Sequence, residues 1–489
     1  MEHFRVEPVC AMDEHSGAAH LTVTIGYIFS GVVNRSQIES AVNSLIQKWP
    51  ILGVRFRRSS SNVLEALIPD ARYAVLATTF YTTFKGIHQV ESLPVRTSTI
   101  TTQRVSRNPQ LYFEKSQPTL EELVSSQSPA FRLHVSCLAD ATVFAFTFPH
   151  LLMGASGAGS VMRGLISLLE GGELLDELEE NPWVDLLNTA PPGDNLSLIR
   201  LFMYGPSDLL ASAEMQRMDL ERDGPISRRT IYFPPAEIAR LKDQAMEELK
   251  ALGLEVPFLS SGDVVVAWLY KHFYGDEQDV AERTNRLIYP LDVQCVPRLL
   301  SFEDRAKTWS RKRLSKAFPP AKVYLKNSTI LNYTSQYTNC KIRDMTLGEL
   351  AKIVREVVTE GSKQEIMLDY IRGKHSCVGG FQGLVPPAER VLCGFASNWL
   401  AFDLGNLDIS KVIKPSTGTG KVLDIYCCVP DVPRCCGCIT FRNQDGGISA
   451  VFDWGEVNWT SGLIARYAIE NTVSDECCIK STSDGINGV

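Results

Sequence analysis

Residues 141–162 contain no Asp, Glu, Lys or Arg, and this uncharged run limits what the chain can fold into more than any other feature. A stretch of this length is compatible with a membrane-spanning helix, which needs about 20 apolar residues. Pro149, His150 and the glycines that follow would leave backbone polar groups unsatisfied in lipid, which disfavours a lipid-facing helix. We therefore predict that the run lies in a buried protein core.

The two halves of this run have different patterns, and His150 lies where they meet. The residues before it, FAFTF, favour a strand, and the residues after it predict a helix that begins just past Gly159 and ends at Gly171. A histidine at the end of a buried strand, beside glycines that allow close backbone approach, is placed where a general base could meet a ligand. The same pattern also fits a structural histidine before a turn, and that alternative stays open.

The length of the chain, 489 residues, exceeds what one hydrophobic core usually serves, so two domains are expected. We predict a first domain at residues 1–190, a crossover linker at 191–228 and a second domain at 229–489, because acidic and Pro/Gly-bearing sequence surrounds the linker. A strand followed by an amphipathic helix opens both halves, and residues 346–371 predict one long amphipathic helix. The predicted fold class is α/β, of the α+β kind with predominantly non-parallel sheet.

Composition and charge exclude several classes of function. The formal net charge is −7 and the basic cluster SRKRLSK is short, so we expect no nucleic-acid binding. The N-terminus has acidic residues early and no basic-then-apolar pattern, so no secretory signal is expected and a cytoplasmic protein is predicted. Thirteen cysteines is an odd number, which favours reduced thiols over a disulfide framework.

Motifs that would bind a metal or a nucleotide are missing or incomplete. The block CCVPDVPRCCGC at residues 427–438 lacks the two-residue gap that lets two thiolates converge on one zinc, so edge strands with buried thiols are favoured. There is no Gly-x-x-x-x-Gly-Lys loop and no Gly-x-Gly-x-x-Gly between a strand and a helix. The segment GASGA only superficially resembles a serine nucleophile elbow centred on Ser156. We expect no metal and no tightly bound cofactor.

The segment HLLMGASG, which starts at His150, resembles the His-x-x-x-Asp-Gly motif of the BAHD-type acyl-CoA-dependent acyltransferases, in particular fungal members similar to trichothecene acetyltransferases. The resemblance extends over nearly the whole chain, with an insertion around residues 301–316. Further segments are similar to family segments in order and spacing: AVNSLIQKWPILGVRFR, IYFPPAEIARLK followed by FLSSGDVVVAWLYK, LIYPLDVQ, PPAKVYLKN, and FASNWLAFDLGNLDISKV.

This resemblance implies a chloramphenicol-acetyltransferase-like fold, in which two similar domains face each other across a tunnel that admits acyl-CoA as cosubstrate and a small-molecule acceptor. His150 takes the position of the family's general base. Ser397 and Trp399 match the family segment that lies beside the oxyanion. The implied function is transfer of an acyl group to a hydroxyl or amine of a secondary metabolite. We expect a monomer without nucleic-acid or membrane partners.

The first signature motif departs from the family pattern. Gly154 stands where the motif aspartate would be, and Gly157 lies further along the same turn. In the segment LDVQ, Asp292 is followed by Gln294 at the position of the family's arginine partner. Loss of both members of a buried ion pair is tolerable where loss of one alone would leave an unpaired charge. Other candidates for the arginine lie in the insertion, at Arg311 and Arg313.

The second signature motif, Asp-Phe-Gly-Trp-Gly in the family, keeps only its aspartate, Asp408. The similar FDWGEV at residues 452–457 lies too far downstream and is interpreted as a look-alike. Because both motifs are weakened, two other functions stay open. One is a cyclase or isomerase of a natural-product intermediate, with His150 as acid or base and no CoA. The other is a binding protein without catalysis.

Overall fold

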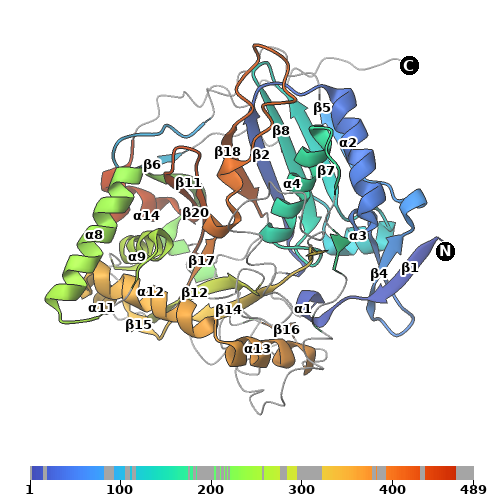
Figure 1. Cartoon of the computed structure of the whole chain (residues 1–489). Coiled ribbons are helices and arrows are strands. Elements are labelled where there is room, and N and C mark those ends of the chain that lie inside the picture. The colour runs from blue at the N-terminus through green and yellow to red at the C-terminus, as the bar shows by residue number, and fades with distance from the viewer. Residues whose placement is uncertain are drawn as a thin grey trace.

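The structure is a computed structural model, and Figure 1 shows two lobes side by side, each built around a β-sheet. It describes residues 3–14, 19–81, 93–104, 111–112, 117–174, 177–179, 183, 203–204, 207, 210, 214, 217–218, 221–255, 258–275, 284–293, 322–376, 381–382, 392–429 and 436–469. The mixture of helices and predominantly antiparallel strands confirms the predicted α+β fold class.

The N-terminal lobe holds a five-stranded sheet in the order β18-β2-β8-β7-β5. Its strands are β2 (Thr22–Ser30), β5 (Ala77–Tyr81), β7 (Arg132–Cys137), β8 (Ala141–Pro149) and β18 (Val422–Cys428). Every residue of β8 is buried because the sheet is covered on both faces. Side chains alternate between the faces: Phe144, Phe146 and Phe148 join one core cluster, and Val143 and Ala145 join another. This arrangement explains why the run carries no charge.

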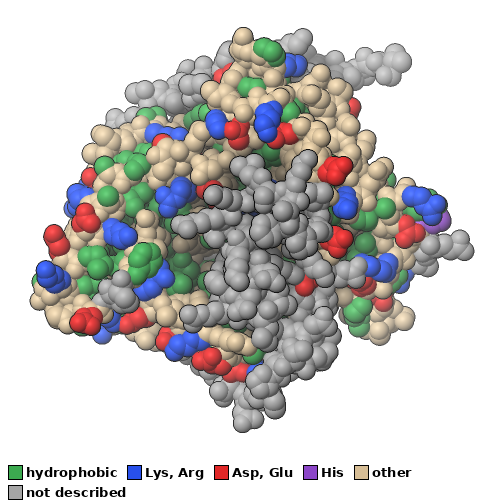
Figure 2. Space-filling view, viewed as in Figure 1, with side chains coloured by type: hydrophobic (Ala, Val, Ile, Leu, Met, Phe, Trp, Pro, Cys, Tyr) green, Lys and Arg blue, Asp and Glu red, His purple; other side chains and the backbone are tan. Residues whose placement is uncertain are grey.

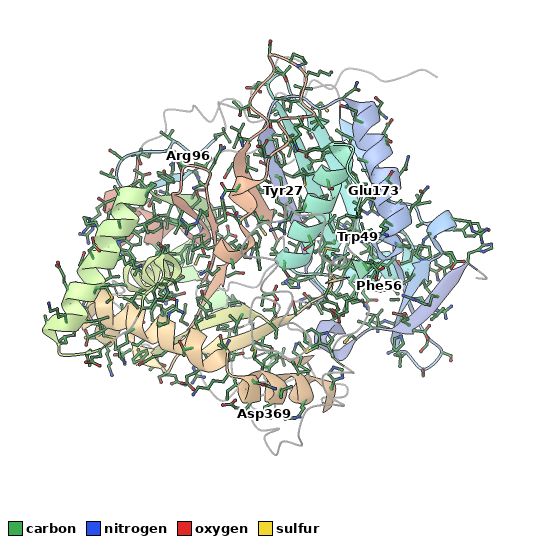
Figure 3. All side chains as sticks on the ribbon, viewed as in Figure 1. Tyr27, Trp49, Phe56, Arg96, Glu173 and Asp369 are labelled. Atoms are coloured by element: carbon green, nitrogen blue, oxygen red, sulfur yellow. The ribbon has the colours of Figure 1, made fainter. Side chains whose placement is uncertain are left out.

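Helices α2 (Arg35–Lys48) and α4 (Ala155–Leu169) pack together beside this sheet. Trp49, which caps the C-terminus of α2, is buried and lies against Gly164 of α4 (Figure 3). Helix α2 presents apolar residues at i, i+3, i+4, i+7 and i+8 to the core, as expected for an amphipathic helix. Asn34 starts the helix because its side chain accepts the N–H of Ser36.

The C-terminal lobe holds an eight-stranded sheet, whose main path is β14-β12-β17-β19-β20-β11-β6. Its strands are β6 (Thr101–Arg104), β11 (Ile226–Phe233), β12 (Thr284–Asp292), β14 (Thr329–Tyr333), β15 (Tyr337–Thr338), β17 (Leu392–Asn398), β19 (Cys436–Arg442) and β20 (Ile448–Gly455). Helices α8 (Pro235–Ala251), α9 (Ser261–Tyr274) and α12 (Leu347–Gly361) contact one another and pack on this sheet.

Each lobe lends a strand to the sheet of the other. Strand β18 comes late in the chain but pairs antiparallel with β2 of the N-terminal sheet. Strand β6 comes early in the chain but pairs antiparallel with β11 at the edge of the C-terminal sheet. The early and late parts of the chain are therefore joined by main-chain hydrogen bonds within each sheet, which the sequence pattern did not indicate. The division of the chain at residues 191–228 stays a prediction, because most of that segment lies outside the described residues.

The remaining elements are short, apart from one helix. They are β1 (Phe4–Pro8), α1 (Ala11–Glu14), β3 (Arg55–Arg58), β4 (Leu64–Pro69), α3 (Leu120–Ser126), β9 (Glu177–Leu178), β10 (Met203–Tyr204), β13 (Lys322–Val323), α11 (Asn339–Asp344), α13 (Gln364–Ser376), β16 (Phe381–Gln382), α14 (Glu456–Ser461), and the 3₁₀ turns Pro50–Gly53, Ala71–Tyr73, Leu400–Phe402, Leu404–Asn406 and Leu463–Tyr467.

Two helix predictions were wrong in their bounds. Helix α4 begins at Ala155, so Gly157 and Gly159 lie inside its first turns rather than before it. The pattern at residues 346–371 forms two helices, α12 and α13, rather than one. The break follows Gly361, where an added Cβ would lie 2.3 Å from the side chain of Asn332. This close packing favours glycine at the last residue of α12.

The surface of the described residues mixes charges of both signs. Figure 2 shows Lys and Arg side chains interspersed with Asp and Glu over the visible face, without a large area of one sign. Among the described helices, none is long and apolar enough to cross a bilayer.

Candidate active site

His150 directly follows β8 and precedes α4, at the strand-to-helix junction that the sequence predicted. Its main-chain N–H donates to the carbonyl of Leu21 at 2.7 Å, which continues the pairing of β8 with β2. The residue is half-buried. Within the described part of the chain, its Nδ1 is buried and has no hydrogen-bond partner. Because the residue is partly exposed and Nε2 is not among the buried atoms without a partner, we infer that Nε2 is the ring nitrogen on the accessible side.

The environment of His150 favours the neutral imidazole. Burial lowers the pKa of the ring from its ordinary value of 6.5, and the positive charge of Lys374 lowers it further. The nearby polar groups of the His150 backbone and of the Asn327 side chain oppose this shift in pKa. Lys374 itself is buried, with its Nζ 5.7 Å from the centre of the Tyr370 ring. A neutral imidazole with an accessible Nε2 is ready to accept a proton.

The residues after β13 reach across to the N-terminus of α4. An added Cβ on Gly157 would lie 2.1 Å from the carbonyl oxygen of Leu325, so glycine is required for this approach. Two residues later, the Nδ2 of Asn327 donates to the main-chain carbonyl of His150 at 2.6 Å. An added Cβ on Gly154 would lie 3.4 Å from the Oδ1 of Asn327. Asn327 therefore stands beside the position where the family has its aspartate.

We predict that Gly157→Ala destabilises the protein by about 1–3 kcal/mol, because the new methyl group overlaps the Leu325 carbonyl and must displace backbone. The free energy of unfolding in urea measures this effect. Gly159→Ala is the matched control on the same helix, because its Cβ would meet the movable side chains of Leu404 and Arg163. Equal stability of the two variants would contradict the close approach of Leu325.

A buried carboxylate holds Asn327 in place. Asp13 of α1 is buried, and its Oδ1 accepts both the main-chain N–H and the Nδ2 of Asn327, each at 3.0 Å. Burial raises the pKa of Asp13 to about 6, although the charges of Lys326 and Lys374 and the hydrogen bonds from Asn327 act in the opposite direction. Asp13, Asn327 and Lys374 form a buried polar group beside His150, which the sequence analysis did not identify.

Little in the sequence could have revealed this group. Asp13 lies in the polar segment MDEHSG, which is typical of a surface segment. It is buried where α1 packs on α13 and on the segment that carries Asn327. The segment PPAKVYLKN, which ends at Asn327, was noted for its resemblance to a family segment. An asparagine after an apolar strand was the one available signal, and it did not specify a role.

Ser397 and Trp399 form one unit at the end of β17. The indole Nε1 of Trp399 donates to the Oγ of Ser397 at 2.9 Å. Trp399 is buried in the core cluster that also contains Phe148 and Leu151, the apolar neighbours of His150. The 3₁₀ turn after Trp399 is tied to α4, because the guanidinium of Arg163 donates to the carbonyl of Phe402. The segment carrying Ser397 therefore packs on the helix that follows His150.

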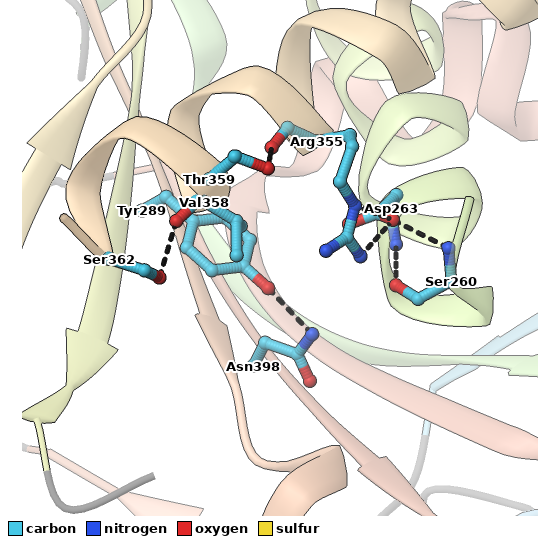
Figure 4. Close-up of polar contacts among 8 residues, drawn as sticks. All are labelled: Ser260, Asp263, Tyr289, Arg355, Val358, Thr359, Ser362 and Asn398. Carbon is cyan, nitrogen blue, oxygen red and sulfur yellow. Dashed lines mark hydrogen bonds and ion pairs between the residues drawn. The ribbon is translucent and has the colours of Figure 1, made fainter. Parts of the chain in front are cut away.

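Asn398, between these two residues, anchors the unit to the C-terminal lobe (Figure 4). Its Nδ2 donates to the Oη of Tyr289 at 2.7 Å, and its Oδ1 accepts the main-chain N–H of Leu400 at 3.0 Å. Burial raises the pKa of Tyr289 to about 12, so its hydroxyl keeps its proton. Nearby in the same view, the buried Asp263 accepts from the Nε of Arg355 at 2.8 Å. The bond to Tyr289 fixes β17 to β12, and the pair of Asp263 and Arg355 fixes α9 to α12.

The other predicted residues lie apart from His150 or outside the described residues. Asp292, at the end of β12, accepts the hydroxyl of Ser328 at 2.7 Å and so helps to place the segment that carries Asn327. Asp408 pairs with Lys421 in a partly exposed loop. Burial raises the pKa of Asp408, but bonds to Lys421 and Ser410 outweigh burial and leave it lowered. The positions outside the described residues are Gln294, Arg311 and Arg313.

The cysteine-rich block contributes to two strands. Cys427 and Cys428 lie in β18, an edge strand, and Cys438 lies in β19, an interior strand. Cys427 and Cys438 are buried free thiols, and burial raises the pKa of each to about 12. Among the described residues, no three His, Cys, Asp or Glu side chains are grouped as metal ligands would be.

A cavity of about 340 Å³ lies elsewhere in the N-terminal lobe. Its wall combines cations and carboxylates with apolar side chains, and includes Arg5, Lys48, Asp70, Glu179 and Lys326. None of the predicted site residues lines this cavity. The tunnel implied by the family resemblance therefore stays a prediction.

The chain as a whole is similar to known acetyltransferases. No protein-family model matches the chain. Acetyltransferase adrJ of Penicillium roqueforti is 25% identical over 414 residues, which cover 81% of this chain and 79% of that protein. O-acetyltransferase PaAT-2 of Phomopsis amygdali is 24% identical over 391 residues, which cover 73% of this chain and 74% of that protein.

A solved structure shows the same fold. The crystal structure of F. sporotrichioides TRI101 with coenzyme A and T-2 matches with a TM-score of 0.61 and 13% identity, covering 93% of this chain and 96% of that one. This likeness confirms the two-domain architecture. The chain resembles the BAHD-type acyl-CoA-dependent acyltransferases in sequence as well as in fold, and the comparisons support an enzyme of the acyltransferase class.

Proposed function

We propose that this protein transfers an acyl group from acyl-CoA to a hydroxyl or amine of a small secondary metabolite, with His150 as the general base. The observation that carries the proposal is the half-buried His150, which has a lowered pKa and an accessible Nε2 at the start of α4. The relatives named above are acetyltransferases, and one is an O-acetyltransferase, which supports a hydroxyl acceptor. The solved structure similar to this chain contains coenzyme A, which supports acyl-CoA as the cosubstrate.

The reaction follows from the chemistry of a neutral imidazole. His150 Nε2 takes the proton of the acceptor hydroxyl while the acceptor oxygen attacks the thioester carbonyl. The resulting tetrahedral oxyanion collapses, the carbon–sulfur bond breaks, and the imidazolium returns its proton to the departing thiolate. The products are the acylated metabolite and free CoA. General-base assistance of this kind contributes about 10²–10⁴-fold to a rate.

Ser397 carries a hydroxyl that could donate to the oxyanion. Because its Oγ accepts the indole N–H of Trp399, the hydroxyl proton of Ser397 is free to point elsewhere. A donor that is fixed before the reaction stabilises developing negative charge without reorganisation. We assign the Ser397 hydroxyl to the oxyanion and Trp399 to the orientation of that hydroxyl.

We expect kcat/KM for acyl transfer to rise with pH as His150 loses its proton, and to reach half its maximum below pH 6.5. The sign follows from the pKa of the ring, which burial lowers from 6.5, so the neutral base persists into mildly acidic solution. Rates measured across buffers of overlapping range, with the fold monitored by circular dichroism, test this expectation. A half-maximum well above pH 7 would contradict it.

Release of free thiol from acetyl-CoA, with small hydroxylated natural products as acceptors, tests the function itself. Transfer predicts thiol release that depends on the acceptor and a product heavier by one acetyl group in mass spectrometry. The alternative, a cyclase or isomerase, predicts turnover of a metabolite without CoA and without a change in mass. The catalytically inactive alternative predicts neither result.

A further inference from the structure

We propose that Asn327 is a positioning residue for His150: its side-chain amide holds the main chain of His150 through Nδ2 and fixes the protonated ring nitrogen as Nδ1 through Oδ1. The inference deepens the proposed function and rests on it, because it explains how Nε2 is kept as the base. Asp13 completes the arrangement because its carboxylate accepts from the same Nδ2 and from the main-chain N–H of Asn327.

The orientation of the Asn327 amide is set by its neighbours. Oxygen atoms of three groups surround Nδ2: the carbonyl of His150 at 2.6 Å, the carboxylate of Asp13 at 3.0 Å and the carbonyl of Leu151 at 3.4 Å. These are all acceptors, so the amide nitrogen must face them, and the flipped amide would place oxygen against oxygen. Oδ1 is therefore directed away from Asp13.

The opposite end of the amide and the ring of His150 each have one unused polar atom. Oδ1 of Asn327 is buried without a hydrogen-bond partner, and so is Nδ1 of His150. The bond from Nδ2 of the same amide to the carbonyl of His150, at 2.6 Å, brings the two residues together. The Asn327 side chain also raises the pKa of His150, as an acceptor facing the ring would. Oδ1 of Asn327 is an acceptor, and Nδ1 of His150 is a donor when it carries the proton of the ring. A buried polar atom left unpaired is unfavourable by about 1–3 kcal/mol, which favours closing this contact.

A hydrogen bond from Nδ1–H of His150 to Oδ1 of Asn327 would fix the tautomer of the His150 ring. It would place the proton of the neutral imidazole on Nδ1, and the lone pair would then lie on Nε2, the accessible nitrogen. Hydrogen bonds at catalytic groups are often long without substrate and shorten when the complex forms. The contact is therefore expected to tighten when a ligand excludes water from the ring.

Gly154 fits this arrangement. A Cβ at position 154 would lie 3.4 Å from Oδ1 of Asn327, so a carboxylate carried there would bring further acceptor oxygens to an atom that is already an acceptor. Glycine leaves Oδ1 available to the ring. The carboxylate of this site comes instead from Asp13 in α1, which contacts the amide at Nδ2. Asp13 interacts with four further side chains: Cys10, Tyr324, Lys326 and Lys374. The two lysines carry positive charges that stabilise its negative carboxylate.

Nuclear magnetic resonance of the full chain labelled with ¹⁵N-histidine tests the proposal without turnover. His150→Ala identifies the signals of His150 by their loss. We expect the neutral ring of the unmodified protein to carry its proton on Nδ1, and Asn327→Ala to shift it to Nε2, the tautomer that free histidine prefers. Asn443→Ala is the control, because Asn443 is also a buried asparagine but bonds to Ser449 in the C-terminal lobe. It should leave the His150 signals unchanged.

A ring protonated on Nε2 in the unmodified protein would overturn the proposal, and so would an Nδ1–H signal that survives Asn327→Ala. The spectrum of the unmodified protein decides the first point even if the variant does not fold. In transfer assays, Asn327→Ala should lower kcat by about 10²-fold through misplacement of the base, with KM little changed. If the tautomer result holds but no transfer occurs, the proposed function fails while the positioning of His150 stands.

Discussion

His150→Ala is expected to lower kcat/KM for acyl transfer by about 10²–10⁴-fold while leaving the affinity for acyl-CoA unchanged. The physical reason is that the variant removes the proton acceptor but not the surface that binds the cosubstrate. Steady-state release of thiol, measured at saturating acceptor, gives the rate. Calorimetric titration with acetyl-CoA gives the affinity of the same preparation.

The matched control for this variant is His3→Ala. His3 stacks on the ring of Tyr73 and its carbonyl accepts the main-chain N–H of Asp70, and these printed contacts among the described residues involve no site residue. The control should retain full rate and nearly full stability. A His150→Ala variant that folds and keeps full activity would make His150 a structural histidine, the alternative that its apolar surroundings left open.

Ser397→Ala is expected to lower kcat by about 10²–10³-fold with little change in KM, because a donor to the oxyanion acts mainly in the transition state. The variant also removes the acceptor for the Trp399 indole, so its stability must be measured in parallel. Initial rates at several acyl-CoA concentrations separate kcat from KM.

Ser362→Ala is the control for this second variant. Ser362 caps α12, and its hydroxyl donates to the carbonyl of Val358 at 2.6 Å, as Figure 4 shows. Both variants lose one serine hydroxyl in the C-terminal lobe, but only Ser397 belongs to the proposed site. If the two variants lose activity to the same extent, Ser397 acts through folding rather than through the oxyanion.

The sequence pattern predicted the strand before His150 and the helix after it, because the spacing of apolar residues within each segment determines these two elements. The uncharged run became β8 and α4, and the alternation of Val143, Phe144 and Ala145 between two core clusters explains why charge is missing on both faces. Helix α4 nevertheless begins earlier than predicted. Glycine is a poor helix former, so Gly157 was placed outside the helix, but the close approach of Leu325 requires it inside.

The rest of the site depends on contacts between distant parts of the chain. Strands β6 and β18 each join the sheet of the other lobe, and nothing in an apolar strand identifies its pairing partner. Asp13 and Asn327 are separated by more than half of the chain and meet only because α1 packs on α13 beside the segment after β13. An aspartate in a polar N-terminal segment reads as exposed, since carboxylates are rarely buried without partners.

Calorimetric titration of the purified protein with acetyl-CoA, with longer acyl-CoAs and with free CoA tests acyl transfer most directly. We predict binding of at least one acyl-CoA in the micromolar range, with the same affinity in His150→Ala and with acceptor-dependent thiol release only when His150 is present. Absence of binding across the whole panel, together with conversion of a metabolite at unchanged mass, would contradict acyl transfer and assign His150 to a cyclase or isomerase.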